Sequence, residues 1–253
     1  MTALQAEWIK LRSVRSTTWM LLAIVGLTIA IGAISSSTSH TEGAPGGGDD
    51  DVVAISLAGV YVAQIAAVAF GVLAICSEYA TGTIRTTFAA NPRRHQVLAA
   101  KGTIVGGLVL GCAVVAALAA FYIGQAILHT NGYTYDNGYP AASLGDGHTL
   151  RTVAIAALYP VVLAMLSLGA ATIVRNTATA ISVLLGVLFV PWIVAGLLPE
   201  DVGQAIEKAT PMAGIAAQER GAPIAPWAGF GVTVAWAVGA LVVALWLVGR
   251  RDA

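Results

Sequence analysis

The chain has 253 residues, of which 57% are hydrophobic and only 10% are charged, and its mean hydropathy is +0.80. Soluble domains carry about 25% charged residues, so the composition excludes an ordinary soluble domain and predicts an integral membrane protein. The 13 basic and 13 acidic side chains cancel, so the net charge does not indicate a nucleic-acid partner.

The first 17 residues combine apolar side chains at helical spacing with basic residues. Leu4, Trp8, Leu11 and Arg15 recur every three or four positions. This pattern predicts an amphipathic helix in the membrane interface over residues 1–17. A basic flank with a tryptophan anchor, which orients the first span, is an alternative and compatible interpretation.

Six apolar segments are long enough to cross about 30 Å of hydrocarbon, which takes about 20 residues of helix. They predict one all-α transmembrane domain over residues 1–253, with spans at 18–36, 52–76, 103–128, 152–174, 178–198 and 227–248. The first span also has features of a cleaved signal peptide, because basic residues precede it and small residues end it. The distribution of charges favours six spans over five.

Charged residues divide unequally between the predicted loops. If the N-terminus is cytoplasmic, ten Lys and Arg residues lie in inner segments and three lie in outer loops. Basic residues accumulate on the cytoplasmic side of membrane proteins. The count therefore predicts a multi-pass plasma-membrane protein with both termini in the cytoplasm.

Residues 77–101, SEYATGTIRTTFAANPRRHQVLAAK, form a polar and basic segment between two spans. The acid Glu78 precedes a turn at Gly82, and an apolar pair four residues apart follows at Ile84 and Phe88. An Asn-Pro pair then interrupts the pattern. This arrangement predicts a short helix across the cytoplasmic membrane surface, with one face available to another protein.

The segment 199–226, between the last two spans, mixes acidic and apolar residues. Val202, Ile206 and Ala209 share one helical face before a Thr-Pro pair. This spacing predicts a short helix that re-enters the outer leaflet. An ordinary surface loop is the alternative.

The predicted spans hold no ionisable side chain at mid-depth, and their most polar deep residue is Gln64. Ion-coupled transporters usually place ionisable groups there, so an ion-coupled carrier is disfavoured. The four histidines lie in loops on both sides and neither cysteine has a metal-ligating neighbour, so we expect no catalytic residue, cofactor or metal site. The sequence also lacks the Gly-Lys-Ser/Thr of an ATP-binding P-loop.

The opening AEWIKLRSVRSTTWMLL and the 77–101 segment resemble the permease subunit of ABC-2 type ABC transporters, of a bacterial, actinobacterial kind. The resemblance in layout covers essentially the whole chain. It implies an N-terminal elbow helix, six spans, a coupling helix after the second span and a re-entrant segment after the fifth. It also implies that two permeases, identical or related, pair with two copies of a cytoplasmic ATPase that binds ATP and Mg²⁺.

The resemblance assigns roles to individual residues. It implies an ATPase-coupling segment that comprises Glu78, Thr81, Gly82, Thr83, Ile84, Arg85, Phe88, Arg93 and Arg94. Lys101 continues this basic stretch into the third span, although a cytoplasmic location alone also explains the basic residues. The family layout places spans two and five beside the pathway, where Gln64, Phe189 and Trp192 are candidate lining residues.

These observations predict the permease of an ATP-driven exporter that has no enzymatic activity of its own. We expect it to alternate between inward-open and outward-open states as its partner binds and hydrolyses ATP. An apolar pathway suits an amphipathic, antibiotic, peptide or lipid-like substrate. A membrane scaffold or sensor that recruits a cytoplasmic partner without transport is the main alternative. An intramembrane enzyme and an independent channel or carrier are the others.

Overall fold

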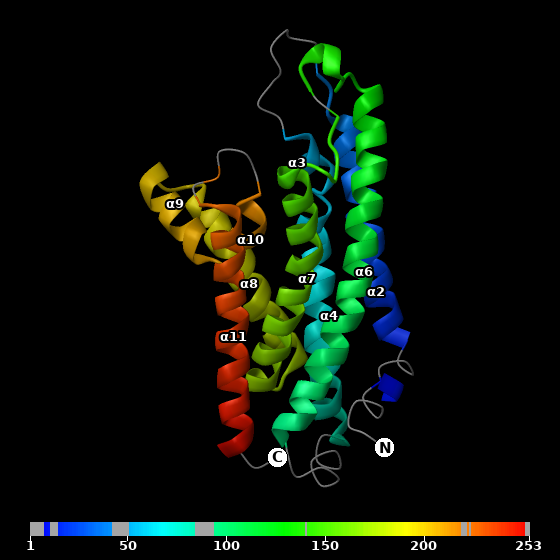
Figure 1. Ribbon diagram of the computed structural model, residues 1–253. Helices are drawn as coiled ribbons and strands as arrows, with labels where there is room; N and C mark the ends of the chain where they lie inside the picture. The colour runs from blue at the N-terminus through cyan, green and yellow to red at the C-terminus, as the bar shows by residue number, and fades with distance from the viewer. Residues whose placement is uncertain are drawn as a thin grey trace.

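The computed structural model describes residues 8–10, 15–41, 51–83, 94–139, 141–218, 222 and 224–250. Six long helices dominate them (Figure 1), namely α2 (Arg15–Thr38), α4 (Val60–Thr81), α6 (Arg94–Thr130), α7 (Gly147–Val174), α8 (Thr177–Ala195) and α11 (Pro226–Arg250). Each is long and apolar enough to span a membrane. The predicted all-helical fold is confirmed, the six long helices are candidate membrane spans, and no strand occurs among the described residues.

Short helices lie toward one end of the bundle, which we call the loop end (Figure 1). They are α3 (Val52–Ser56), the 3₁₀ turn η1 (Tyr135–Asn137), α9 (Glu200–Ala209) and α10 (Ala213–Ala216). The start of α2 and the end of α11 lie at the opposite end, which we call the terminal end. The first span therefore begins, and the last span ends, on the same side of the bundle.

Helices α4 and α7 form the centre of the bundle. About two thirds (67%) of the most apolar part of each is buried, against 22% for α2, α8 and α11. Helix α7 packs against α4, α6, α8 and α11, and α2 packs against α4 and α6. The peripheral helices expose large apolar side chains such as Trp19 and Trp246, so lipid or another membrane protein must cover them.

The predicted span 52–76 is divided in the structure. Asp51 caps α3, because its Oδ1 accepts hydrogen bonds from the backbone N–H groups of Val53 (3.1 Å) and Ala54 (3.3 Å). Gly59 then packs on α2 so closely that a Cβ there would lie 2.1 Å from the carbonyl oxygen of Thr28. Only glycine fits this contact. The main helix therefore starts at Val60 and continues to Thr81, past the predicted end.

Helix α6 is longer than the predicted span 103–128. It has 37 residues and so measures about 55 Å, well beyond the roughly 30 Å of a hydrocarbon core. Val97 and Leu98, which precede the predicted span, are buried and extend the packed face toward the terminal end. Near the loop end, the Nε2 of Gln125 donates hydrogen bonds to the carbonyl of Val52 and the hydroxyl of Ser56, both at 3.0 Å. One continuous helix thus connects the two ends.

Gly71 allows α4 to contact α7 closely, and replacing it should destabilise the bundle. A Cβ at Gly71 would lie 2.4 Å from the carbonyl oxygen of Ala164, whereas a Cβ at Gly107 in α6 meets no atom within 4 Å. We expect Gly71→Ala to cost about 1–3 kcal/mol by overpacking, measured by thermal denaturation in detergent. The control Gly107→Ala should be neutral or stabilising, since alanine favours helix. Equal melting temperatures would contradict the close contact.

Candidate coupling and pathway sites

Glu78 lies at the centre of an ion cluster at the terminal end of α4. Its Oε1 accepts hydrogen bonds from the Nζ of Lys101 at 2.8 Å and the Nζ of Lys10 at 3.2 Å. The side chain of Lys101 is 1% exposed and that of Glu78 is 9% exposed. We call these three residues the Glu78 cluster. It joins α4 to α6 and to the short stretch that precedes α2.

The burial of the Glu78 cluster changes how Glu78 can act. A buried charge costs several kcal/mol unless opposite charges and hydrogen bonds compensate it, and here two ammonium groups surround one carboxylate oxygen. We expected Glu78 on a docking face, but the residue is 7% exposed. It has almost no surface to offer a partner, so its influence on one would pass through its lysine neighbours and the helices that carry them.

The end of α4 presents the next three predicted coupling residues to solvent. Thr81, Gly82 and Thr83 are exposed, and Gly82 ends the helix in a left-handed conformation with φ 72°. The hydroxyls of Thr81 and Thr83 are 2.9 Å apart, within hydrogen-bonding distance across the turn at Gly82. Predicted coupling residues Ile84, Arg85, Phe88 and Arg93 lie outside the described residues. Arg94 begins α6, although its side chain is outside the described part.

A second contact connects the end of α4 to the turn between α7 and α8. The guanidinium carbon of Arg175 lies 5.3 Å from the centroid of the Tyr79 ring, which is the geometry of a cation–π interaction. Arg175 follows the last residue of α7 in a left-handed conformation, with φ 59°. Neither residue is among the coupling residues predicted from the sequence. One sequence feature could have drawn attention to Arg175: it is the one basic residue between the fourth and fifth predicted spans.

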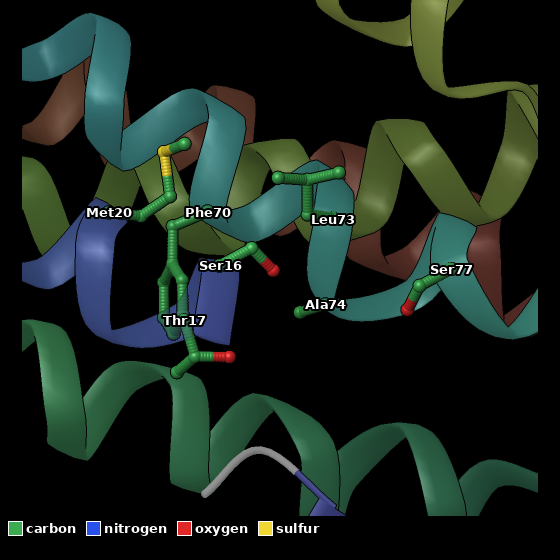
Figure 2. A pocket seen from close by; sticks show the side chains of 7 residues that line it. All are labelled: Ser16, Thr17, Met20, Phe70, Leu73, Ala74 and Ser77. Atoms are coloured by element: carbon green, nitrogen blue, oxygen red, sulfur yellow. The ribbon is translucent and has the colours of Figure 1, made fainter. Parts of the chain in front are cut away.

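A small cavity lies between α2 and α4 (Figure 2). Its volume is about 50 Å³, and it is lined by Ser16, Thr17, Met20, Phe70, Leu73, Ala74 and Ser77. A space of this size holds one or two water molecules, whereas binding sites for organic ligands measure roughly 300–1,000 Å³. The cavity is therefore a packing defect with hydroxyl groups at its edge, and too small to admit a substrate.

Gln64 lies inside the chain between α4 and α7. Its side chain has no exposed surface. Its Oε1 accepts a hydrogen bond from the hydroxyl of Tyr159 at 2.9 Å, and its Nε2 donates to the carbonyl of Tyr61 at 2.8 Å. In this conformation Gln64 does not line a surface, because the Tyr159 pair uses its polar atoms within the bundle.

The other two candidate lining residues lie on α8. Phe189 is half-buried and packs against the central core, and Trp192 is 48% exposed. Both occupy the half of α8 that is nearer the loop end. The three candidates therefore differ in burial, and only Trp192 has a largely open face.

The segment between α8 and α11 packs alongside the half of α11 that is nearer the loop end. The hydroxyl of Thr233 donates to the carbonyl of Pro211 at 2.8 Å, and the indole N–H of Trp236 donates to the carbonyl of Ala209 at 2.9 Å. Thr233 and Trp236 lie about 10 and 15 Å along α11 from its start at Pro226, at 1.5 Å per residue. Part of the 199–226 segment thus lies beside the span and not above its end.

The described residues contain no group of three or more His, Cys, Asp and Glu side chains that could hold a metal ion. No curated protein matches the chain. A family model for the ABC-2 family transporter protein matches residues 6–253. This match includes all six long helices. The chain therefore belongs to the ABC-2 family and is a permease of the ABC-2 type.

Proposed function

We propose that this chain is the permease of an ATP-driven exporter, in which two permeases, identical or related, form the pathway between them. Membership of the ABC-2 family supports a transport role and an ATPase partner. The proposal adds the orientation, with the terminal end in the cytoplasm, because most of the described Lys and Arg residues lie at that end and basic residues accumulate on the cytoplasmic side. It also adds that ATP and Mg²⁺ bind to the partner.

The Glu78 cluster is the observation that carries the coupling mechanism. Helix α4 ends at Thr81 and α6 begins at Arg94, so the predicted coupling segment leaves one helix and returns in the other. The 2.8 Å contact between Glu78 and Lys101 joins these two helices close to both points. A displacement of the segment by the ATPase would therefore move α4 and α6 together.

Within this proposal the coupling residues have two different tasks. Exposed Thr81, Gly82 and Thr83 lead into the surface that contacts the ATPase, which consists of Ile84, Arg85, Phe88, Arg93 and Arg94. Glu78 is a positioning residue, because it is buried and holds the helices that carry this surface. The contact of Arg175 with Tyr79 extends the same connection to the turn between α7 and α8.

The apolar surfaces of the chain support a pathway for amphipathic cargo. No Asp, Glu, Lys, Arg or His lies at mid-depth in the spans as the structure describes them. Helices α2, α8 and α11 are little buried within one chain, so a second permease has apolar faces available for pairing. Phe189 and Trp192 on α8 would line the pathway near the loop end, below the re-entrant α9 and α10. Antibiotics, peptides and lipid-like molecules fit this surface.

Affinity purification of the tagged chain from its native membrane tests the proposed function. Mass spectrometry should identify a soluble ATPase with a P-loop, and the purified complex should hydrolyse ATP. Recovery of the folded chain with no ATPase and no ATP hydrolysis would contradict the proposal. That result would favour a membrane scaffold or sensor, whose partner need not bind nucleotide.

A further inference from the structure

An apolar groove runs along the surface of the bundle between α8 and α11. Leu166 and Ala170 of α7 form its floor, Val183 and Val187 of α8 form one wall, and residues 232–243 of α11 form the other. Its volume is about 620 Å³. Helices α8 and α11 both pack on α7 but make little or no contact with each other, which leaves the groove open to the membrane.

The lining offers no free hydrogen-bonding group to an occupant. The side chains that line the groove are apolar except for the indole N–H of Trp236, and that N–H already donates to the carbonyl of Ala209 at 2.9 Å. The backbone polar groups here are bonded within helices. Whatever fills the groove must therefore be hydrocarbon along this length.

The length of the groove suits an acyl chain. The α11 wall extends from Val232 to Val243, or about 16 Å at 1.5 Å per residue, and an extended acyl chain can lie along this length between α8 and α11. A helix of a second copy is the competing occupant of this open apolar face, and cross-linking between copies distinguishes the two.

The groove face of α11 continues to a polar anchor at the terminal end. Trp236 and Val243 line the groove, and Arg250 follows at the same seven-residue spacing, so all three lie on nearly the same face. The guanidinium carbon of Arg250 lies 4.3 Å from the centroid of the exposed Trp246 ring. In the part of the chain that the structure describes, no carboxylate pairs with Arg250. Tryptophan and arginine at this depth are typical of a headgroup contact.

We propose that this groove binds an anionic phospholipid of the leaflet at the terminal end. One acyl chain would lie between α8 and α11, and the phosphate would contact Arg250 beside Trp246. A guanidinium binds phosphate oxygens in pairs. An anionic lipid is favoured over a zwitterionic one because it brings no ammonium group to repel the arginine. This site is separate from the Glu78 cluster and does not depend on ATPase coupling.

Native mass spectrometry of the purified chain, titrated with phosphatidylglycerol or phosphatidylcholine, tests the lipid site. Gly239 lines the groove and Gly231 lies elsewhere on α11, and neither would place a Cβ within 4 Å of another group. Gly239→Leu should fill the groove, and Gly231→Leu is its matched control. We expect wild type and Gly231→Leu to prefer phosphatidylglycerol. Gly239→Leu should retain less of either lipid, and Arg250→Ala should lose about fivefold in affinity for the anionic one.

Three results would overturn the proposal. The first is equal retention of the two lipids by wild type or unchanged retention by Arg250→Ala, which would remove the headgroup contact. The second is unchanged retention by Gly239→Leu, which would place the lipid elsewhere. The third is cross-linking of two copies of the Gly239→Cys variant in native membranes, because a second chain would then occupy the groove. Melting temperatures of all variants, measured in parallel, separate loss of lipid from loss of fold.

Discussion

Glu78→Ala is expected to destabilise the chain by about 3–5 kcal/mol, because it removes the carboxylate that pairs with the buried ammonium group of Lys101. The side chain of Lys101 is 1% exposed and contacts the carboxylate at 2.8 Å. The variant should melt at a lower temperature in detergent. In complex with the ATPase it should also lose ATP hydrolysis stimulated by substrate, since α4 and α6 would no longer move together.

A double variant separates the structural effect of the Glu78 cluster from its role in coupling. Replacing both partners of a buried ion pair is often neutral or stabilising, so Glu78→Leu combined with Lys101→Met should recover most of the lost stability. If the charged pair transmits movement between α4 and α6, substrate should still fail to stimulate ATP hydrolysis in the complex of this folded double variant. Full recovery of coupling would show that the cluster only stabilises the fold. An unchanged melting temperature of Glu78→Ala alone would contradict the ion pair itself.

Phe88→Asp is expected to weaken ATPase binding without changing the stability of the chain. In the proposed function Phe88 is an apolar anchor on the docking surface, and loss of such an anchor commonly costs 2–4 kcal/mol. We expect the ATPase to dissociate during purification, with an affinity at least roughly thirtyfold weaker by titration.

Tyr135→Asp provides the matched control for Phe88→Asp. Tyr135 is 83% exposed at the loop end, so the same kind of change places a new carboxylate on the opposite side of the bundle. The control should bind the ATPase normally. Equal loss of binding in both variants would indicate a general effect of charge, and normal binding by Phe88→Asp would place the docking surface elsewhere.

The spans were predictable because hydropathy is a sum over neighbouring residues, but several of their limits were not. The break before Val60 arises where Gly59 contacts the backbone of Thr28, a contact between distant parts of the chain. The early start of α6 at Arg94 was missed because its first turns are polar. A helix that projects beyond the membrane needs no continuous apolar sequence.

The positions of the site residues were harder to predict than the spans. Glu78 attracted notice as an acid in a basic segment, but its burial depends on Lys10 and Lys101, which no local spacing connects to it. Gln64 was noted for its depth, whereas its partner Tyr159 is 95 positions away in the sequence. Pairing across the bundle decides which polar residues face inward, and one sequence alone does not contain that information.

Because α6 is long, a small tilt of the helix at the terminal end produces a large displacement at the loop end. Lys101 and Gln125 lie on this helix about 36 Å apart at 1.5 Å per residue. A tilt of about 10° about Lys101 would displace Gln125 by about 6 Å. The two 3.0 Å hydrogen bonds of Gln125 to Val52 and Ser56 cannot survive such a displacement unless α3 moves as well. Opening at the loop end would then be detectable as a hinge at the turn between α3 and α4.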